Sequence, residues 1–243
     1  MNTKIYTFAS WKGGTGKTSL SCAAIETLAK QGSGILIIDL DSNLSMSSIY
    51  NAIGANYTSI DLLNGNIICP NITSIRMSDR DIKAFIIPSD LRIARLNNIS
   101  DRVLKTYLSK IKNIDVYDYI FIDPPGTMNA LTRNAMVAAD KIIIPAMISD
   151  IDYQATGLIM EELEMIGVDA DVKIVLNRFD AKRTPVDAEN RFRHDEKLQP
   201  FLWPGKIPSM KSICRLTAEL LTGYSLQGAA KTIIDNFVEE VIK

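Results

Sequence analysis

The chain has 243 residues, 47% of them hydrophobic and 23% charged, which is typical of a folded protein with a sizeable core and excludes a largely disordered one. Its 28 acidic and 27 basic residues give a formal net charge of −1, so overall charge argues neither for nor against binding to nucleic acid. The chain contains neither an apolar run of about 18 residues nor a signal-peptide pattern at its start, so we expect a cytoplasmic protein with one domain over residues 1–243.

Short apolar runs recur along the chain and leave room for helices between them. We predict buried strands, in chain order, at residues 5–9, 35–38, 85–87, 119–122, 142–144 and 172–176. Helical spacing of apolar residues predicts helices over 20–30, 130–139 and 158–166. This alternation favours an α/β fold in which helices flank both faces of a mostly parallel, twisted sheet. The segment 200–208, rich in Pro, Gly and Lys, is predicted to be a surface loop.

The three cysteines, Cys22, Cys69 and Cys214, are widely separated and form no Cys-x-x-Cys pair. This spacing predicts buried thiols in a reducing compartment rather than a metal site or disulfides.

The first predicted strand runs into the stretch SWKGGTGKT, residues 10–18, and a predicted helix follows. In such an arrangement backbone N–H groups surround a phosphate group. We expect the ammonium of Lys17 at the β- and γ-phosphates and the hydroxyl of Thr18 at a magnesium ion. The general phosphate-loop pattern has a glycine where Trp11 stands, so a plain glycine-rich turn is the alternative. The strand and helix around the loop favour nucleotide binding, which we assign to Gly13, Gly14, Thr15, Gly16, Lys17, Thr18 and Ser19.

This loop resembles the deviant Walker A motif, x-Lys-Gly-Gly-x-Gly-Lys-Ser/Thr, of the ParA/MinD family of ATPases, in which the first position need not be glycine. Three further segments resemble the same family in the same order. They are Asp39-Leu-Asp41-Ser-Asn43, Ile87-Pro-Ser-Asp-Leu91 and Asp123-Pro-Pro-Gly126, which are similar to its D-x-D-P-Q, I-P-S/A and Walker B segments. The resemblance covers nearly the whole chain and implies a P-loop NTPase with ATP and Mg²⁺ as cofactors.

The resemblance also implies roles for individual residues. Lys12 is expected to reach across a homodimer and contact the phosphates of the other subunit, which makes dimerisation depend on ATP. Asp41 is expected to position the attacking water, and Thr18, Asp41 and Asp123 to hold magnesium. Asp39 is as readily explained as a cap at the end of a strand. Ser42 and Asn43 replace the family's Pro and Gln, so we expect this segment to be more mobile or to change the turnover rate.

A GTPase is an alternative of the same class. Asp123-Pro-Pro-Gly126 satisfies the D-x-x-G pattern of GTPases, and Asn177-Arg-Phe-Asp180 is one substitution from N-K-x-D. Trp11 argues against a GTPase loop, and Asn-Arg after this strand is equally familiar in the ATPase family, where it borders the adenine. We therefore favour ATP, with Asn177, Arg178 and Pro208 at the base.

The segment 178–215 has a net charge of +4 in a chain that is otherwise acidic. Such a segment could bind phosphate groups of non-specific DNA, and a dimer would double this surface. The alternative is a solvated helix face with internal salt bridges. His194 is expected to be exposed rather than catalytic. The residues assigned to DNA are Arg191, Arg193, Lys197, Lys206, Lys211 and Arg215.

The tail, residues 229–243, has an apolar side, but Asp235, Glu239 and Glu240 make its polar side acidic. We therefore predict a closing helix packed on the domain rather than the membrane helix of MinD-type relatives.

Because the phosphate loop starts close to Met1, we expect no operator-binding region in front of it. The resemblance is greatest to a small ParA, a nucleoid-associated DNA-segregating ATPase stimulated by a centromere-binding, ParB-like protein. A MinD-like positioning ATPase and a small-molecule ligase of the same fold are the alternatives.

Overall fold

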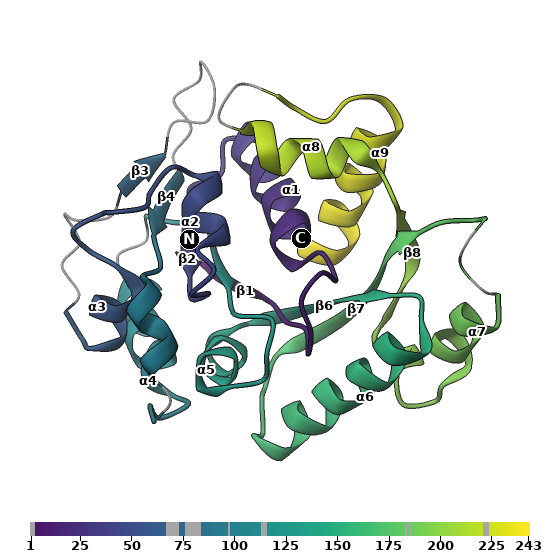
Figure 1. Ribbon diagram of the computed structural model, residues 1–243, viewed down its shortest axis with the longest axis horizontal. Helices are drawn as coiled ribbons and strands as arrows, with labels where there is room; N and C mark the ends of the chain where they lie inside the picture. The colour runs from purple at the N-terminus through teal and green to yellow at the C-terminus, as the bar shows by residue number, and fades with distance from the viewer. Residues whose placement is uncertain are drawn as a thin grey trace.

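The structure is a computed structural model that describes residues 3–66, 73–75, 84–96, 98–112, 116–182, 184, 186–220 and 224–243. Within these residues one sheet of eight strands has the order β3-β4-β2-β5-β1-β6-β7-β8 (Figure 1). All paired strands are parallel except β3, which lies antiparallel to β4. The strands are β1 Lys4–Phe8, β2 Ile35–Asp39, β3 Thr73–Ile75, β4 Ala84–Ile87, β5 Tyr119–Asp123, β6 Lys141–Met147, β7 Asp171–Phe179 and β8 Leu202–Pro208.

Helices cover both faces of the sheet, as the alternating pattern predicts (Figure 1). Helices α1, α8 and α9 pack on one face, and α4, α5, α6 and α7 pack on the other. The helical segments are α1 Lys17–Lys30, α2 Ser45–Ile49, α3 Ser59–Leu63, the 3₁₀ turn η2 Leu91–Arg95, α4 Val103–Lys112, α5 Ala130–Ala138, α6 Asp150–Met165, α7 Val186–His194, the 3₁₀ turn η3 Gln199–Phe201, α8 Lys211–Glu219, α9 Gly228–Phe237 and the π-helical turn η5 Val238–Ile242.

The predicted central strands form because both faces of the sheet are covered. All five residues of β2 are buried, and β1 and β5 bring Phe8 and Phe121 into stacked contact with ring centroids 6.3 Å apart. Continuous apolar runs suit strands with this double burial.

The prediction of a surface loop over residues 200–208 is wrong, because residues 202–208 form β8 at the edge of the sheet. Trp203 and Ile207 are buried there, and β8 pairs with β7 through an irregular register. Proline cannot donate to a strand ladder, but an edge strand has one unpaired side, so Pro204 and Pro208 are tolerated. The short edge strand β3 is also absent from the sequence prediction.

The cysteine prediction is correct in part. Cys22 is a buried free thiol, but Cys214 is exposed. Helix α8 turns Ile213 and Leu216 toward the core, which leaves Cys214 outside. Cys69 lies outside the described residues.

The helical segment of residues 228–242 packs into the core, as predicted for the closing helix. Phe237, Val238, Val241 and Ile242 are fully buried. The hydroxyl of Tyr6 on β1 also donates a hydrogen bond of 2.7 Å to the carbonyl of Ile242. Among the described helices, none combines the length and the apolar composition that crossing a bilayer requires.

Candidate functional site

The glycine-rich loop joins the end of β1 to the start of α1, at the carboxyl edge of the sheet. Gly16 is the N-cap of α1 and has a φ of 102°, a conformation that glycine adopts readily. A Cβ on Gly16 would lie 2.2 Å from the side-chain nitrogen of Asn177. The loop therefore needs glycine here for both conformation and space. Because the first N–H groups of a helix lack partners within it, the start of α1 suits an anion.

Lys17 is the first residue of α1, and its side chain is almost completely buried beside the loop. Its Nζ donates a hydrogen bond of 3.1 Å to Oγ of Ser10. Burial lowers the pKa of Lys17, and the nearby Asp123 and Asp41 offset part of this effect. A desolvated ammonium of this kind gains strongly from a phosphate group.

Thr18 and Asp123 meet as the magnesium prediction requires. The Thr18 hydroxyl donates a hydrogen bond of 2.9 Å to Oδ2 of Asp123 at the end of β5. The other oxygen, Oδ1, is buried and has no hydrogen-bond partner among the described residues. Burial, with a further contribution from Asp39, raises the pKa of Asp123. An unpartnered carboxylate oxygen next to a threonine hydroxyl fits the oxygen ligands that Mg²⁺ prefers.

Asp39 caps the loop that follows β2, which confirms the capping alternative for this residue. Its Oδ1 accepts a 3.0 Å hydrogen bond from the backbone N–H of Asp41, and its Oδ2 accepts two from Ser47. The Asp41 carboxylate in turn accepts from the N–H of Asn43 at 2.9 Å, so residues 41–43 form an Asx turn where the family has proline.

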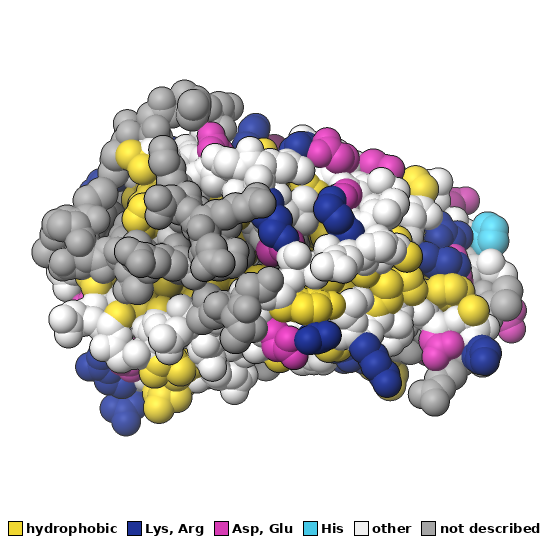
Figure 2. Space-filling model, turned by 90° about the horizontal axis from the view of Figure 1, so that it is seen from above, with side chains coloured by type: hydrophobic (Ala, Val, Ile, Leu, Met, Phe, Trp, Pro, Cys, Tyr) yellow, Lys and Arg dark blue, Asp and Glu magenta, His cyan; other side chains and the backbone are white. Residues whose placement is uncertain are grey.

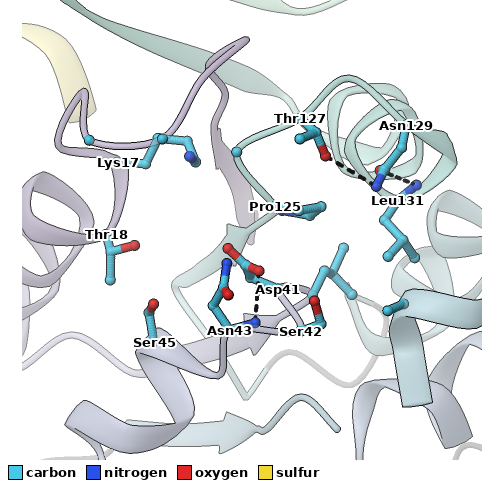
Figure 3. Close-up of a pocket in the computed structure, with 15 residues that line it drawn as sticks. Lys17, Thr18, Asp41, Ser42, Asn43, Ser45, Pro125, Thr127, Asn129 and Leu131 are labelled. Atoms are coloured by element: carbon cyan, nitrogen blue, oxygen red, sulfur yellow. Dashed lines mark hydrogen bonds between the residues drawn. The ribbon is translucent and has the colours of Figure 1, made fainter. Parts of the chain in front are cut away.

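A pocket of about 490 Å³ above the carboxyl edge of the sheet is lined by Lys17, Thr18, Asp41 and Asn43 among others. Figure 3 shows Lys17 and Thr18 on one side, Thr127 and Asn129 on the other, and Asp41 between them. The segment after β5 approaches the loop closely, since a Cβ on Gly126 would lie 3.1 Å from the backbone nitrogen of Gly13. Sequence reasoning gave no site role to Ser10 and Asn43, although both stand in the quoted motifs, and it missed Ser45, Thr127 and Asn129.

A second, smaller pocket of about 160 Å³ adjoins the start of α1, and the three predicted base-site residues, Asn177, Arg178 and Pro208, all line it. The amide of Asn177 donates a 2.7 Å hydrogen bond to the carbonyl of Thr15 and accepts one of 2.8 Å from the N–H of Arg178. Asn177 therefore ties β7 to the phosphate loop. Gly16 and Ser19, which were assigned to nucleotide binding, also line this pocket, whereas sequence reasoning missed Leu20, Ser209, Met210, Ile213 and Cys214.

The guanine pattern receives no support from this pocket. Asp180, its last residue, is not among the residues that line the pocket as the structure describes it. Its carboxylate instead accepts a 2.9 Å hydrogen bond from the N–H of Lys182 within its own turn.

Lys12 lies at the start of the loop, and its partner was not predicted. Its Nζ lies 2.8 Å from Oδ2 of Asp152 in the first turn of α6, where the lysine is 32% exposed and the aspartate 2%. Ser149 caps α6 through the backbone N–H of Asp152. The Ser-x-x-Asp spacing of residues 149–152 is the sequence signal that could have located this helix start.

Four of the six residues assigned to DNA form ion pairs, as the alternative of internal salt bridges requires. Arg191 pairs with Asp150, Arg193 and Lys206 both pair with Glu189, and Arg215 pairs with Glu219. Lys197 and Lys211 are exposed and form no ion pair within the described residues. Figure 2 shows basic and acidic side chains interspersed over the face seen from above. His194 is exposed, as expected.

A family model described as an AAA domain matches residues 3–174. The chromosome-partitioning ATPase Soj of Treponema pallidum is 29% identical over 167 residues, which are 67% of this chain and 64% of that protein. Among solved structures, the plasmid partition protein of Borrelia burgdorferi has a TM-score of 0.78 at 22% identity and covers 99% of this chain and 100% of its own.

The septum site-determining protein MinD of Pyrococcus horikoshii, complexed with Mg-ADP, has a TM-score of 0.78 at 22% identity, with 99% of this chain and 96% of that chain covered. The chain spans less than two thirds of the length of Soj. The family model covers well over half of the chain. The phosphate loop and Asp41 line one pocket, and Asp123 is joined to this site by the hydrogen bond that it accepts from Thr18. This chain therefore belongs to the ParA/MinD-like AAA-domain family of ATPases.

Proposed function

We propose that this protein is a Mg²⁺-dependent ATPase that dimerises when it binds ATP, binds DNA non-specifically as a dimer, and releases DNA after hydrolysis. Such a cycle would segregate a plasmid, a chromosome or a conjugative element. The observation that carries the proposal is a second ammonium, that of Lys12, at the start of a loop whose own phosphate ligand is Lys17. Two cations beside one polyphosphate are favourable only while that charge is present, which links dimerisation to ATP.

The residues around the pocket have different roles in the proposed hydrolysis of ATP. Lys17 and the N–H groups of the loop would hold the phosphates, and Thr18, Asp41 and Asp123 would hold magnesium. Magnesium bound there would supply positive charge that offsets the negative charge developing during phosphoryl transfer. Asp41 orients the water, because its carboxylate faces the pocket from an ordered turn. Structures of the fold that contain Mg-ADP or ATP support these cofactors.

The DNA surface would lie on α7 and α8 and in the segments around them. Exposed Lys197 and Lys211 form no ion pair within the described residues, and we assign them the first contacts with phosphate. Arg191, Arg193, Lys206 and Arg215 would have to exchange an acid for DNA phosphate, which lowers their contribution. A ParB-like protein would stimulate turnover.

A second candidate function is favoured by that same pairing. If Arg191, Arg193, Lys206 and Arg215 remain paired with acidic residues, they are not available to DNA. The ATP-dependent dimer would then act on a protein, as a positioning ATPase does. The name of the septum site-determining relative supports this alternative.

DNA retention measured with ATP, with ADP and without nucleotide tests the proposal. We expect salt-sensitive DNA binding only with ATP and Mg²⁺, and its loss in Lys12→Ala and Lys17→Ala. An Asp41→Ala protein should bind ATP and DNA but hydrolyse slowly. Equal DNA binding in all three nucleotide states, or none in any, would contradict the DNA step and leave the positioning function.

A further inference from the structure

An apolar groove lies beside α6, away from the phosphate loop. It has a volume of about 780 Å³ and runs between α6, the start of β7 and the segment that leads from α7 to β8. Its apolar lining includes Met160, Val168, Val172, Leu198 and Phe201. Figure 1 shows α6 along the lower side of the sheet beside α7, with its last turns near the amino ends of the strands. The groove is therefore separate from the nucleotide pocket.

Gly157 lies in the middle of α6 and lines this groove. A Cβ placed on it would meet no atom within 4 Å, and its φ is not positive. Glycine weakens a helix relative to alanine, and neither conformation nor packing within this chain requires glycine here. A glycine at this position is explained if a partner from outside the chain packs closely against the backbone of α6.

The charge of α6 indicates the chemistry of that neighbour. The helix contains five acidic residues and no lysine or arginine. Three of them have partners, since Asp150 pairs with Arg191, Asp152 with Lys12 and Glu162 with Arg133. Glu161 and Glu164 line the groove and form no ion pair or hydrogen bond within the described residues. They are available to a cation.

Exposed apolar side chains extend the same surface. Leu158 is 44% exposed and Met165 is 77% exposed, and both lie one helical step from the groove. From Tyr153 to Glu164 the helix offers a length of about 18 Å, which corresponds to about three turns of a docked helix. Of the charged residues that line the groove, Glu161, Glu164 and Asp195 are acidic and Lys197 is basic, so the rim carries net negative charge. An apolar groove with such a rim and this length suits an amphipathic helix whose polar side is basic. A second copy of α6 would bring acids against acids.

We propose that this groove is a docking site for a cationic amphipathic helix of a partner protein. Gly157 allows the partner helix to approach closely, and Glu161 and Glu164 pair with its lysine or arginine residues. The site does not depend on the phosphate pocket. It shares Lys197 with the proposed DNA surface, and a peptide-binding test without DNA keeps the two proposals distinguishable.

The test uses the full chain and a fluorescein-labelled peptide of leucine and lysine at helical spacing, with a matched peptide in which glutamate replaces lysine. Fluorescence anisotropy at physiological salt should show binding of the lysine peptide only. Gly157→Gln, which fills the hollow, and the double variant Glu161→Lys, Glu164→Lys should each weaken binding about tenfold. The double variant Asp235→Lys, Glu239→Lys changes the net charge equally, on α9 and η5, and should bind as the wild type does.

Binding of a fluorescent ATP analogue should be unchanged in Gly157→Gln, which shows that this variant is folded. Protection from hydrogen–deuterium exchange should appear in residues 153–172 when the lysine peptide is bound. Equal binding of the glutamate peptide, equal loss in the α9 control, or protection only elsewhere would overturn the proposal. Self-association of the protein alone that Gly157→Gln abolishes would identify a second copy as the occupant and would also overturn it.

Discussion

The ammonium of Lys12 lies 2.8 Å from the carboxylate of Asp152, so the lysine proposed to serve a neighbouring subunit is held by its own helix α6. Asp152 is nearly inaccessible, whereas Lys12 is partly exposed. Lys12 must leave this carboxylate before it can reach another subunit. The ion pair therefore opposes dimerisation until a stronger negative charge is available to the lysine.

Weakening this pair should favour the dimer. We expect Asp152→Asn to strengthen ATP-dependent dimerisation about fivefold, because a partly exposed pair contributes about 1 kcal/mol. Sedimentation velocity over a range of protein concentrations measures this. Asp150→Asn is the matched control, since Asp150 precedes it in the same turn but pairs with Arg191. Weaker dimerisation of Asp152→Asn than of this control would show that Asp152 supports the dimer instead.

The phosphate loop should be intolerant of a side chain at Gly16. In Gly16→Ala the Cβ would lie 2.2 Å from the Asn177 amide, at a φ of 102° that strains alanine. We expect a loss of stability of about 1–3 kcal/mol and loss of nucleotide affinity. Thermal unfolding and titration with a fluorescent ATP analogue measure the two effects. Gly13→Ala is the control for stability, because its Cβ would meet nothing within 4 Å. Equal melting temperatures for the two variants would refute the close contact.

The buried carboxyls should make the nucleotide-free protein less stable as the pH rises. Burial raises the pKa of Asp39 and of Asp123 above its ordinary value of 3.8. A carboxyl with a raised pKa stabilises the folded state at low pH, and this contribution is lost as the pH rises through the folded pKa. Asp123→Asn stays neutral, so its unfolding free energy relative to that of the wild type should rise between pH 5 and pH 8, by the order of 1 kcal/mol, with a matching rise in relative melting temperature.

The pH test has a clear opposite outcome. A melting-temperature difference between Asp123→Asn and the wild type that is independent of pH would mean that Asp123 is ionised throughout. The same variant should lose its response to Mg²⁺ in nucleotide binding, which separates the ligand role from the stability effect.

The end of the chain should contribute to the fold and not to membrane binding. Phe237 is fully buried and packs against Trp203 with ring centroids 5.9 Å apart. We expect Phe237→Ala to cost about 3–5 kcal/mol of unfolding free energy in denaturant titrations. Glu239→Ala removes only a surface pair with Lys243 and should change stability by less than about 0.5 kcal/mol. Sedimentation with anionic liposomes that depends on residues 229–243 would contradict this account.

The central strands and the phosphate site could be predicted because each has a strong local signal. Apolar runs covered on both faces marked β2 and β5, and the glycine pattern placed Lys17 and Thr18. The edge strand β8 could not be predicted, since Pro204, Gly205 and Pro208 indicate a loop in isolation. Only its pairing with β7 makes the segment a strand.

Contacts between segments that lie far apart in the sequence could not be predicted either. The partner of Lys12 lies 140 residues away in the chain, and only the fold places α6 beside the loop. In the same way, acidic residues near Arg191 and Arg193 gave no indication of which pairs would form. The internal salt bridges reduce the charge that composition alone assigned to this surface.

The most direct test of the account is the mass of the protein in solution with ATP and Mg²⁺, measured by sedimentation velocity on the slowly hydrolysing Asp41→Ala variant with and without Lys12→Ala. The account predicts a dimer for Asp41→Ala and a monomer for the double variant, both with nucleotide bound. A monomer at every concentration for Asp41→Ala, or a dimer that persists without Lys12, would contradict it.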